Sequence, residues 1–455
     1  MRNLEPWIEE TIAELTVTEA DLQRGMARFE EEMALGLRTP GASSLYMEPC
    51  YVDLPTGRER GRAVALDFGG TNARAALVEV TAGGCRVLGA ARRPLRVSGA
   101  YDVTRSETPE ALFDFLAELV REALVKGGAR TDEALPLGHT FSFGTRQQEL
   151  SDARLIVWSK EIEVPGVEGE YVNAQLRAAL ARAGLRHVAP TAILNDTTAV
   201  LLAAAFRHPG TAIATIYATG FNSCYLETFG GRRPPMIYNI ESGSYRHFPQ
   251  SALDRALDAA SSKPGAQRLE KMISGRYLGE LLTRALQRGG QADAPLLSGE
   301  AVGQLAAGAL RALPGGAPLT ETARAGLGAL ARALIRRSAR LAGMTLAAVL
   351  SHRAAVDGQD VIAPQPLAMD GAVFAHMPGV EAELRGTLSL LLGRAAQGLT
   401  LPLVRDASSE GAAIAALLGA EKMKGCSKAV GGSSCTHEEA LDRRAHRSLP
   451  SDKYD

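Results

Sequence analysis

Hydrophobic residues recur at helical spacing near the start of the chain. Between residues 18 and 36, Leu22, Met26, Phe29 and Met33 lie three or four positions apart among acidic and polar neighbours. This spacing predicts an amphipathic helix with one apolar side facing a core.

The middle of the chain alternates between predicted helices and a strand. The helices are predicted at 109–126, 171–183, 197–206 and, with interruptions, 278–352, and an apolar strand is predicted at 188–194. The first of these helices has a clear start, because Thr108 is a capping residue and Pro109 suits the first helical position.

Two segments have the pattern of strand, short turn and strand. In the first, apolar residues 63–68 and 74–80 flank the turn 69–72, and in the second, residues 211–217 and 223–227 flank the turn 218–222. A third apolar strand ends in a turn near Asp370-Gly371. The repeated unit predicts an internally duplicated α/β architecture.

The composition narrows the class of protein. The chain has 455 residues, 46% of them apolar and 22% charged, so it can bury a large core and is expected to form about two to four domains. The 50 basic and 51 acidic residues leave a formal charge of −1, which removes the electrostatic case for binding nucleic acid. No apolar run approaches the roughly 18–20 residues that span a membrane. The five cysteines form no CxxC pair and the first residues lack a signal-peptide pattern, so we expect free thiols and a cytoplasmic location.

Both turns are rich in small residues and threonine. Such a turn exposes backbone N–H groups and a hydroxyl to phosphate oxygens, and Asp67 and Arg74 beside the first turn can add a metal ligand and a positive charge. A plain hairpin turn with glycines at positive φ is the alternative for either turn alone, but two together can clamp a polyphosphate. The chain has no GxxxxGK[ST] P-loop, no HRD loop to accompany Asp67-Phe68-Gly69, and no GxGxxG at the first turn, so a dinucleotide fold is a weak alternative.

Asp196 lies where the predicted strand meets a buried helix. The structural interpretation is a capping aspartate, which binds the first N–H groups of the helix. The functional interpretation is a general base, because a helix N-terminus keeps a carboxylate ionised and able to accept a proton from a bound hydroxyl. The two roles are compatible.

Six ordered segments carry a family resemblance. They are Leu66–Arg74, Thr140–Phe143 with Trp158–Lys160, Leu194–Thr198, Ala218–Asn222, Asn239–Gly243 and Leu269–Gly275. In this order they are similar to the phosphate, sugar and catalytic segments of the hexokinase family, within the actin-like ATPase superfamily. The match covers almost all of residues 10–420.

The resemblance implies a role for each matching residue. Asp196 would be the general base on the sugar 6-hydroxyl, with Lys160 and Arg74 also counted as catalytic. The sugar-binding residues would be Ser142, Phe143, Ser159, Lys160, Asn195, Asp196, Asn222, Glu241 and Glu270. The residues around ATP would be Asp67, Gly69, Gly70, Thr71, Asn72, Arg74, Thr219, Gly220 and Ser408, with Asp67 holding Mg²⁺ through water.

The implied fold is α/β, a two-domain actin-like or ribonuclease H-like hexokinase fold with an interdomain cleft. The small domain would comprise 61–196 with a returning C-terminal helix near 405–420. The large domain would comprise 1–60 and 197–404, and residues 421–455 are predicted to form a mobile polar tail. Sugar binding would close the cleft and exclude water.

The implied activity is ATP-dependent phosphorylation of a hexose, with glucose as the expected sugar, but four positions depart from the family pattern. Ala218 replaces a glycine of the second turn, Ser242 replaces an aromatic residue, Gly144 replaces a proline, and Glu410 replaces a lysine at the nucleotide end. The reversed charge of Glu410 leaves open a weaker ATP site or another phosphoryl donor. A sugar sensor with little catalysis and a kinase of another hexose are the alternative functions, and the oligomeric state is left open.

Overall fold

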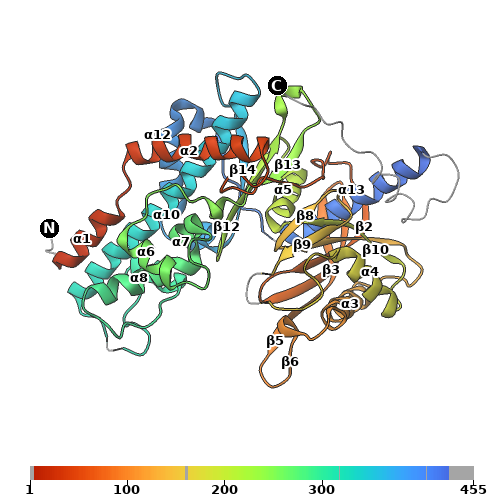
Figure 1. Ribbon diagram of the computed structural model, residues 1–455, viewed down its shortest axis with the longest axis horizontal. Coiled ribbons are helices and arrows are strands. Elements are labelled where there is room, and N and C mark those ends of the chain that lie inside the picture. The colour runs from red at the N-terminus through yellow and green to blue at the C-terminus, as the bar shows by residue number, and fades with distance from the viewer. Residues whose placement is uncertain (1–4, 159–161, 317, 406, 430–455) are drawn as a thin grey trace.

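The computed structural model describes residues 5–158, 162–316, 318–405 and 407–429. Figure 1 shows two lobes, each built around a mixed sheet. One sheet has the strand order β10-β7-β2-β3-β4 and the other has the order β1-β13-β12-β11-β14-β15.

The five-stranded sheet belongs to the small lobe. Its strands are β2 (Gly61–Phe68), β3 (Asn72–Thr81), β4 (Gly84–Pro94), β7 (Leu135–Phe141) and β10 (Val188–Leu194). Strands β10, β7 and β2 are parallel, and β3 and β4 continue the sheet antiparallel. The additional elements of this lobe are the hairpins β5 (Arg96–Val97) with β6 (Tyr101–Asp102) and β8 (Gly144–Gln147) with β9 (Ala153–Val157), the 3-10 turn η1 (Val103–Arg105), and helices α3 (Pro109–Lys126) and α4 (Val172–Arg182).

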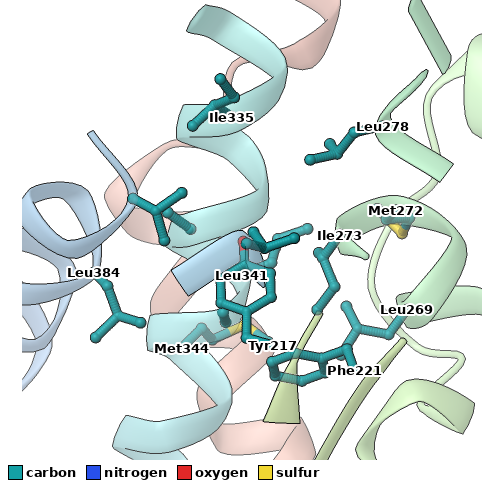
Figure 2. Packing of buried hydrophobic residues seen from close by; sticks show 14 of the residues in the cluster. Tyr217, Phe221, Leu269, Met272, Ile273, Leu278, Ile335, Leu341, Met344 and Leu384 are labelled. Atoms are coloured by element: carbon teal, nitrogen blue, oxygen red, sulfur yellow. The ribbon is translucent and has the colours of Figure 1, made fainter. Parts of the chain in front are cut away.

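The six-stranded sheet belongs to the large lobe. Its strands are β1 (Glu48–Pro49), β11 (Ile213–Tyr217), β12 (Phe221–Glu227), β13 (Met236–Asn239), β14 (Gln365–Asp370) and β15 (Leu399–Thr400). The helices are α1 (Pro6–Leu15), α2 (Glu19–Arg38), α6 (Ala252–Ala260), α7 (Arg268–Ile273), α8 (Gly275–Arg288), α9 (Gly299–Ala306), α10 (Glu321–Val356), α11 (Ala372–His376) and α12 (Val380–Leu392), with 3-10 turns η2 (Phe229–Gly231), η3 (Ser242–Ser244) and η4 (Gly393–Gly398). Figure 2 shows Tyr217 and Phe221, at the two sides of a strand turn, packed among Ile273, Leu341 and Met344.

Strand alternation separates large from small side chains. Because successive residues of a strand point to opposite faces, Val64 and Leu66 join a core with α3 and α4, whereas Ala63 and Ala65 face an alanine-rich core. That second core is built largely on α5 (Asp196–Arg207) and α13 (Ala407–Ala429), and it also includes small residues of the large-lobe sheet. The two helices therefore form a thin layer between the sheets.

Close packing of this layer depends on glycine at two positions. A methyl group on Gly411 of α13 would lie 1.9 Å from the Ala199 carbonyl oxygen of α5. A methyl group on Gly138 of β7 would lie 1.9 Å from the Ala412 carbonyl oxygen. Any side chain here would push the helices away from each other or from the sheet.

Most predicted elements are confirmed, with shifts of a few residues at their ends. The helix predicted at 18–36 is α2, and both strand–turn–strand units are antiparallel hairpins. The prediction of a tail from residue 421 is wrong for its first nine residues, because α13 continues to Ala429. Residues 430–455 lie outside the described part of the chain. Among the described helices, none is both long and apolar enough to cross a membrane.

Candidate functional site

Three parallel strands of the small lobe end at one edge of its sheet. Asp67 of β2 is in register with Thr140 of β7, which is in turn in register with Leu194 of β10. The chain leaves this edge through the first turn, through Ser142-Phe143 and through Asn195-Asp196. The carboxyl ends of parallel strands are where α/β proteins bind ligands, so three of the predicted segments meet there.

The first turn is open on one side. Gly69 N–H donates to the Asn72 carbonyl at 3.3 Å, and Leu95 N–H donates to the Thr71 carbonyl at 2.9 Å. Gly69 does not have a positive φ, and a methyl group on it would meet only the Asn72 oxygen, at 3.7 Å. Neither backbone strain nor crowding accounts for glycine at this position, so the plain hairpin interpretation does not explain it.

Polar side chains form a short chain beside this turn. The Asn72 amide donates from Nδ2 to Thr71 Oγ1 at 3.0 Å, and Arg92 Nε donates to Asn72 Oδ1 at 3.3 Å. Arg74 pairs with Arg92 across β3 and β4, so two guanidinium groups lie near the turn. Arg92 was missed from the sequence, because only the register of β4 brings it here.

The second turn is enclosed by helices. The Ala218 and Thr219 carbonyls accept from the N–H groups of Gly275 (2.8 Å) and Arg276 (3.3 Å), at the start of α8. A methyl group on Gly371 would lie 2.7 Å from the Ala218 Cβ, so the extra methyl of Ala218 faces this glycine. Thr219 is exposed.

Glu270 of α7 touches the backbone of the second turn. Its Oε2 accepts from Phe221 N–H at 3.0 Å. The same oxygen would lie 2.9 Å from a methyl group on Gly220. The Glu270 carboxylate therefore packs directly against the backbone of the second turn.

Two amides and a carboxylate form a cluster next to this turn. Asn222 Nδ2 donates to Asn239 Oδ1 at 2.7 Å, and both amides donate to Glu241 Oε1, at 3.3 Å from Asn222 and 2.7 Å from Asn239. The Asn222 Oδ1 also accepts from Ser242 N–H at 3.2 Å. Groups of this kind suit vicinal hydroxyls, which both donate and accept. Asn239 was not predicted as a site residue, although it lies in a matching segment.

Gly243 follows this cluster in a crowded position. A methyl group on it would lie 2.7 Å from Gln267 Oε1 and 2.9 Å from the Glu270 Cβ. The small residue therefore lets η3, which follows Glu241, approach the helix that carries Glu270.

Asn195, and not Asp196, caps helix α5. Asn195 Oδ1 accepts from Thr197 N–H at 2.9 Å. Asp196 is the first helical residue, and its Oδ1 accepts from the N–H and hydroxyl of Thr197 at 2.8 and 3.3 Å. Among the described residues no partner binds its Oδ2. One oxygen is thus held by the helix start, and the other is available to a ligand.

The first turn of α5 is tied to the large-lobe strands. Cys224 donates to the Thr197 carbonyl at 3.2 Å, and Cys50 lies 3.3 Å from the Thr198 hydroxyl. Burial raises the pKa of Cys50 to about 11 and that of Cys224 well above its ordinary value. Both thiols are neutral packing groups, and their contacts bring Asp196 toward the strand that carries Asn222.

Packed aromatic rings lie on the small-lobe side of the candidate site. The Phe143 ring lies 5.3 Å from that of Phe68 and 5.1 Å from that of Trp158, measured between centroids. Ser142 is buried beside Phe68, whose carbonyl accepts its N–H at 3.5 Å. The predicted residues Ser159 and Lys160 lie outside the described residues.

His139 is a core residue of β7. Burial lowers its pKa to about 4, and its Nδ1 lies 3.0 Å from Asn173 Oδ1. His139 is therefore a structural residue of the small-lobe core.

The nucleotide end predicted at the start of α13 contains Ser408, which is half-buried. Two residues on, the buried Glu410 forms an ion pair with Arg207 at the end of α5. This partner offsets the negative charge that departs from the family pattern. No group of three or more His, Cys, Asp or Glu within the described ranges is arranged to hold a metal ion.

Comparisons with known proteins show which family this chain is similar to. Two family models described as hexokinase match residues 7–206 and residues 212–311 with 306–418. Hexokinase-1 of Oryza sativa subsp. japonica is 32% identical over 441 residues, covering 87% of this chain and 87% of that protein. Hexokinase-1 of Schizosaccharomyces pombe is 34% identical over 309 residues. This match covers 63% of this chain and 61% of the length of the Schizosaccharomyces pombe protein. The match to human Hexokinase-3 spans 46% of that protein.

The chain is also similar in structure to solved hexokinases. A crystal structure of a hexokinase superposes with a TM-score of 0.79 at 29% identity, covering 90% of this chain and 98% of that one. A hexokinase from Schistosoma mansoni, complexed with glucose, superposes with a TM-score of 0.76 at 25% identity and the same coverage.

Proposed function

The chain belongs to the hexokinase family and has its actin-like α/β fold, and we propose that it transfers the γ-phosphoryl group of ATP to the 6-hydroxyl of a hexose, with glucose as the preferred sugar. The observation that carries this proposal is the contact of Glu270 with the second turn. It joins a carboxylate suited to hydroxyls directly to a turn suited to phosphates. The glucose bound to the Schistosoma mansoni structure supports glucose as the sugar.

In this proposal Asp196 is the general base. Its Oδ1 is held by the start of α5, which leaves Oδ2 to accept the proton of the 6-hydroxyl as the oxygen attacks phosphorus. The sugar's other hydroxyls are bound by Asn195, Asn222, Glu241 and Glu270, and Ser142, Phe143, Ser159 and Lys160 are assigned to sugar binding as well. Lys160 is also assigned to catalysis, as the resemblance implies.

The phosphates are proposed to lie between the two turns. The residues assigned to them are Asp67, Gly69, Gly70, Thr71, Asn72, Arg74, Thr219, Gly220 and Ser408. Asp67 fits a hydrated Mg²⁺, because this ion is commonly held by one or two carboxylates together with substrate phosphates. When bound, the ion offsets phosphate charge. Arg74 and Arg92 add positive charge from the protein.

We further propose that residues 61–196 with α13 form the small domain, and that sugar binding closes the cleft between it and residues 1–60 and 197–404. Closure would exclude water as a competing acceptor. The ion pair of Glu410 with Arg207 supports ATP as the donor, because the carboxylate charge has its own partner.

A coupled assay of glucose, mannose, fructose and glucosamine against ATP, ADP, GTP and polyphosphate tests the proposal. The expected result is sugar 6-phosphate formed fastest from glucose and ATP, with a requirement for Mg²⁺. Glucose binding measured by calorimetry without turnover from any donor would instead favour a sugar sensor.

A further inference from the structure

We propose that Glu32, outside the sugar pocket, is a positioning residue for hexose binding, because it holds a loop of the N-terminal arm against the backbone on both sides of Glu241. The loop comprises residues 43–47, and we refer to it as the arm loop. The inference rests on the proposed function, since it assumes that Glu241 binds sugar.

Glu32 is a buried carboxylate that organises the arm loop. Its Oε2 accepts from Ser44 N–H (2.7 Å), from the Ser43 hydroxyl (2.8 Å) and from the Ser44 hydroxyl (2.9 Å). Its Oε1 lies 3.0 Å from Arg28 Nη2 and 3.1 Å from His247 Nε2. The glutamate side chain is only 3% exposed.

The Glu32 carboxylate is charged at neutral pH. Burial opposes ionisation, but the hydrogen bonds from Ser44 and Ser43 outweigh it and hold the pKa below its ordinary value. A charged acceptor forms stronger hydrogen bonds than a neutral one, so the loop is fixed more firmly than an amide would fix it.

The arm loop in turn holds the peptide groups that flank Glu241. On one side, the Ile240 carbonyl accepts from Tyr46 N–H at 3.1 Å and from Met47 N–H at 3.5 Å. On the other side, the Ser244 hydroxyl lies 2.5 Å from the Ser44 carbonyl and 2.6 Å from the Glu241 carbonyl, and shares its single proton between them.

Glu241 needs such support because its backbone is left-handed, with φ 56° and ψ 53°. Residues other than glycine rarely adopt this conformation, and it persists where the surrounding structure imposes it. The same conformation directs the side chain to Asn222 and Asn239. Loosening the arm loop should therefore misplace the Glu241 carboxylate without touching the turns assigned to phosphate.

The chain offers a matched control. Glu227 at the end of β12 is also a buried glutamate of the large lobe, with a side chain 1% exposed, and its Oε2 lies 2.7 Å from His352 Nε2. It also accepts from the Tyr225 hydroxyl at 2.8 Å. Glu227 lies five residues along β12 from Asn222, at about 16 Å for an extended strand, and its hydrogen bonds within the described residues go to Tyr225, Phe229 and His352 rather than to the arm loop.

The experiment compares Glu32→Gln, Ser244→Ala, Ser244→Thr and Glu227→Gln in the full chain. Glucose affinity is measured by calorimetry without nucleotide, the KM for ATP is measured at saturating glucose, and thermal unfolding is followed for each variant. We expect Glu32→Gln and Ser244→Ala to weaken glucose binding about tenfold, the size of one lost hydrogen bond in a buried site, with the KM for ATP changed less than about twofold.

The other two variants separate positioning from general destabilisation. Ser244→Thr keeps the hydroxyl and should retain most of the glucose affinity. Glu227→Gln should lower the unfolding temperature as much as Glu32→Gln does while binding glucose normally. Equal losses of glucose affinity in both glutamate variants, or unchanged affinity in Glu32→Gln, would overturn the inference.

Failure of the proposed function gives a different result. In that case the unmodified chain itself binds no hexose in calorimetry and forms no sugar phosphate. If the unmodified chain binds and phosphorylates glucose but Glu32→Gln behaves identically, only the role of Glu32 is wrong.

Discussion

The two strand turns have similar residues but different neighbours. The first, at 69–72, is bounded by strands and side chains, with Arg92 of β4 reaching Asn72. The second, at 218–220, is bound through its carbonyls to the start of α8 and touches the Glu270 carboxylate. The first turn can therefore change with little effect on the sugar side, whereas the second cannot. Under the proposed function, similar turns in one chain would thus have different roles, the first binding phosphate alone and the second also linking phosphate to sugar.

Removing the base that both turns are proposed to serve should have the largest effect. Asp196→Asn keeps the shape and the bond to Thr197 N–H but cannot accept the proton, so kcat should fall about 100- to 10,000-fold. Glucose binding in calorimetry should change little, because Asn195, Asn222, Glu241 and Glu270 remain. A variant with near-normal turnover would contradict the assignment.

A matched pair of alanine substitutions tests the comparison itself. In Gly220→Ala, the new methyl lies 2.9 Å from Glu270 Oε2, so the carboxylate must move and lose its bond to Phe221 N–H. The KM for glucose should rise about 10- to 100-fold, as expected for a lost charge-assisted hydrogen bond.

The partner substitution is Gly69→Ala in the first turn. The nearest atom to its methyl is 3.7 Å away, so the turn itself is not strained and the KM for glucose should stay within about twofold, as for most substitutions without a steric cost. Any effect should fall on the KM for ATP. Equal effects of the two variants on glucose would show that the turns are equivalent.

The stability of the two lobes that carry these turns should also respond differently to acid. Burial lowers the pKa of His139 to about 4 from an ordinary value of 6.5. Between these values the unfolded chain binds a proton that the folded chain does not, so the free energy of unfolding of the small lobe should fall as pH falls, by about 1.4 kcal/mol per pH unit.

In the large lobe, the buried carboxylate of Glu227 at the far end of β12 is protonated only at lower pH. Burial opposes ionisation of Glu227, but hydrogen bonds from His352 and Phe229 hold its pKa below the ordinary 4.5. Its stabilisation is therefore complete above about pH 4.5 and lost below it. Between pH 7 and pH 5, the hydrogen-exchange protection factors, which are corrected for the intrinsic exchange rate at each pH, should fall more in β7 than in β12. His139→Gln should remove that difference, and its persistence would contradict the assignment.

The sequence was sufficient where the signal is local. Strand alternation and small residues predicted both turns, and helical spacing predicted α2 and α3. The extension of α13 past residue 420 was missed because residues 421–425 are exposed, so this part of the helix has no buried side to produce a hydrophobic period.

Signals that depend on distant contacts were not predictable. Arg92 reaches the first turn only through the register of β3 with β4, which shifts between Leu77 and Val78. Ala218 and Glu410 depart from the family pattern, but the Ala218 methyl faces Gly371 and the Glu410 carboxylate pairs with Arg207. A departure from a motif cannot be weighed until its neighbours are known.

The smallest expected effect concerns the side chain that distinguishes the first turn. Arg92→Ala removes the guanidinium that bonds Asn72, so the KM for ATP should rise about three- to fivefold, typical of a single exposed charge contact. The KM for glucose should not change, because the Glu270 carboxylate bonds the backbone of the second turn, at Phe221 N–H. Arg86→Ala is the matched control on the same strand, since Arg86 is exposed and pairs with Glu79. If Arg92→Ala raised the KM for glucose as much as that for ATP, the first turn would also affect sugar binding. The proposed difference between the two turns would then be wrong.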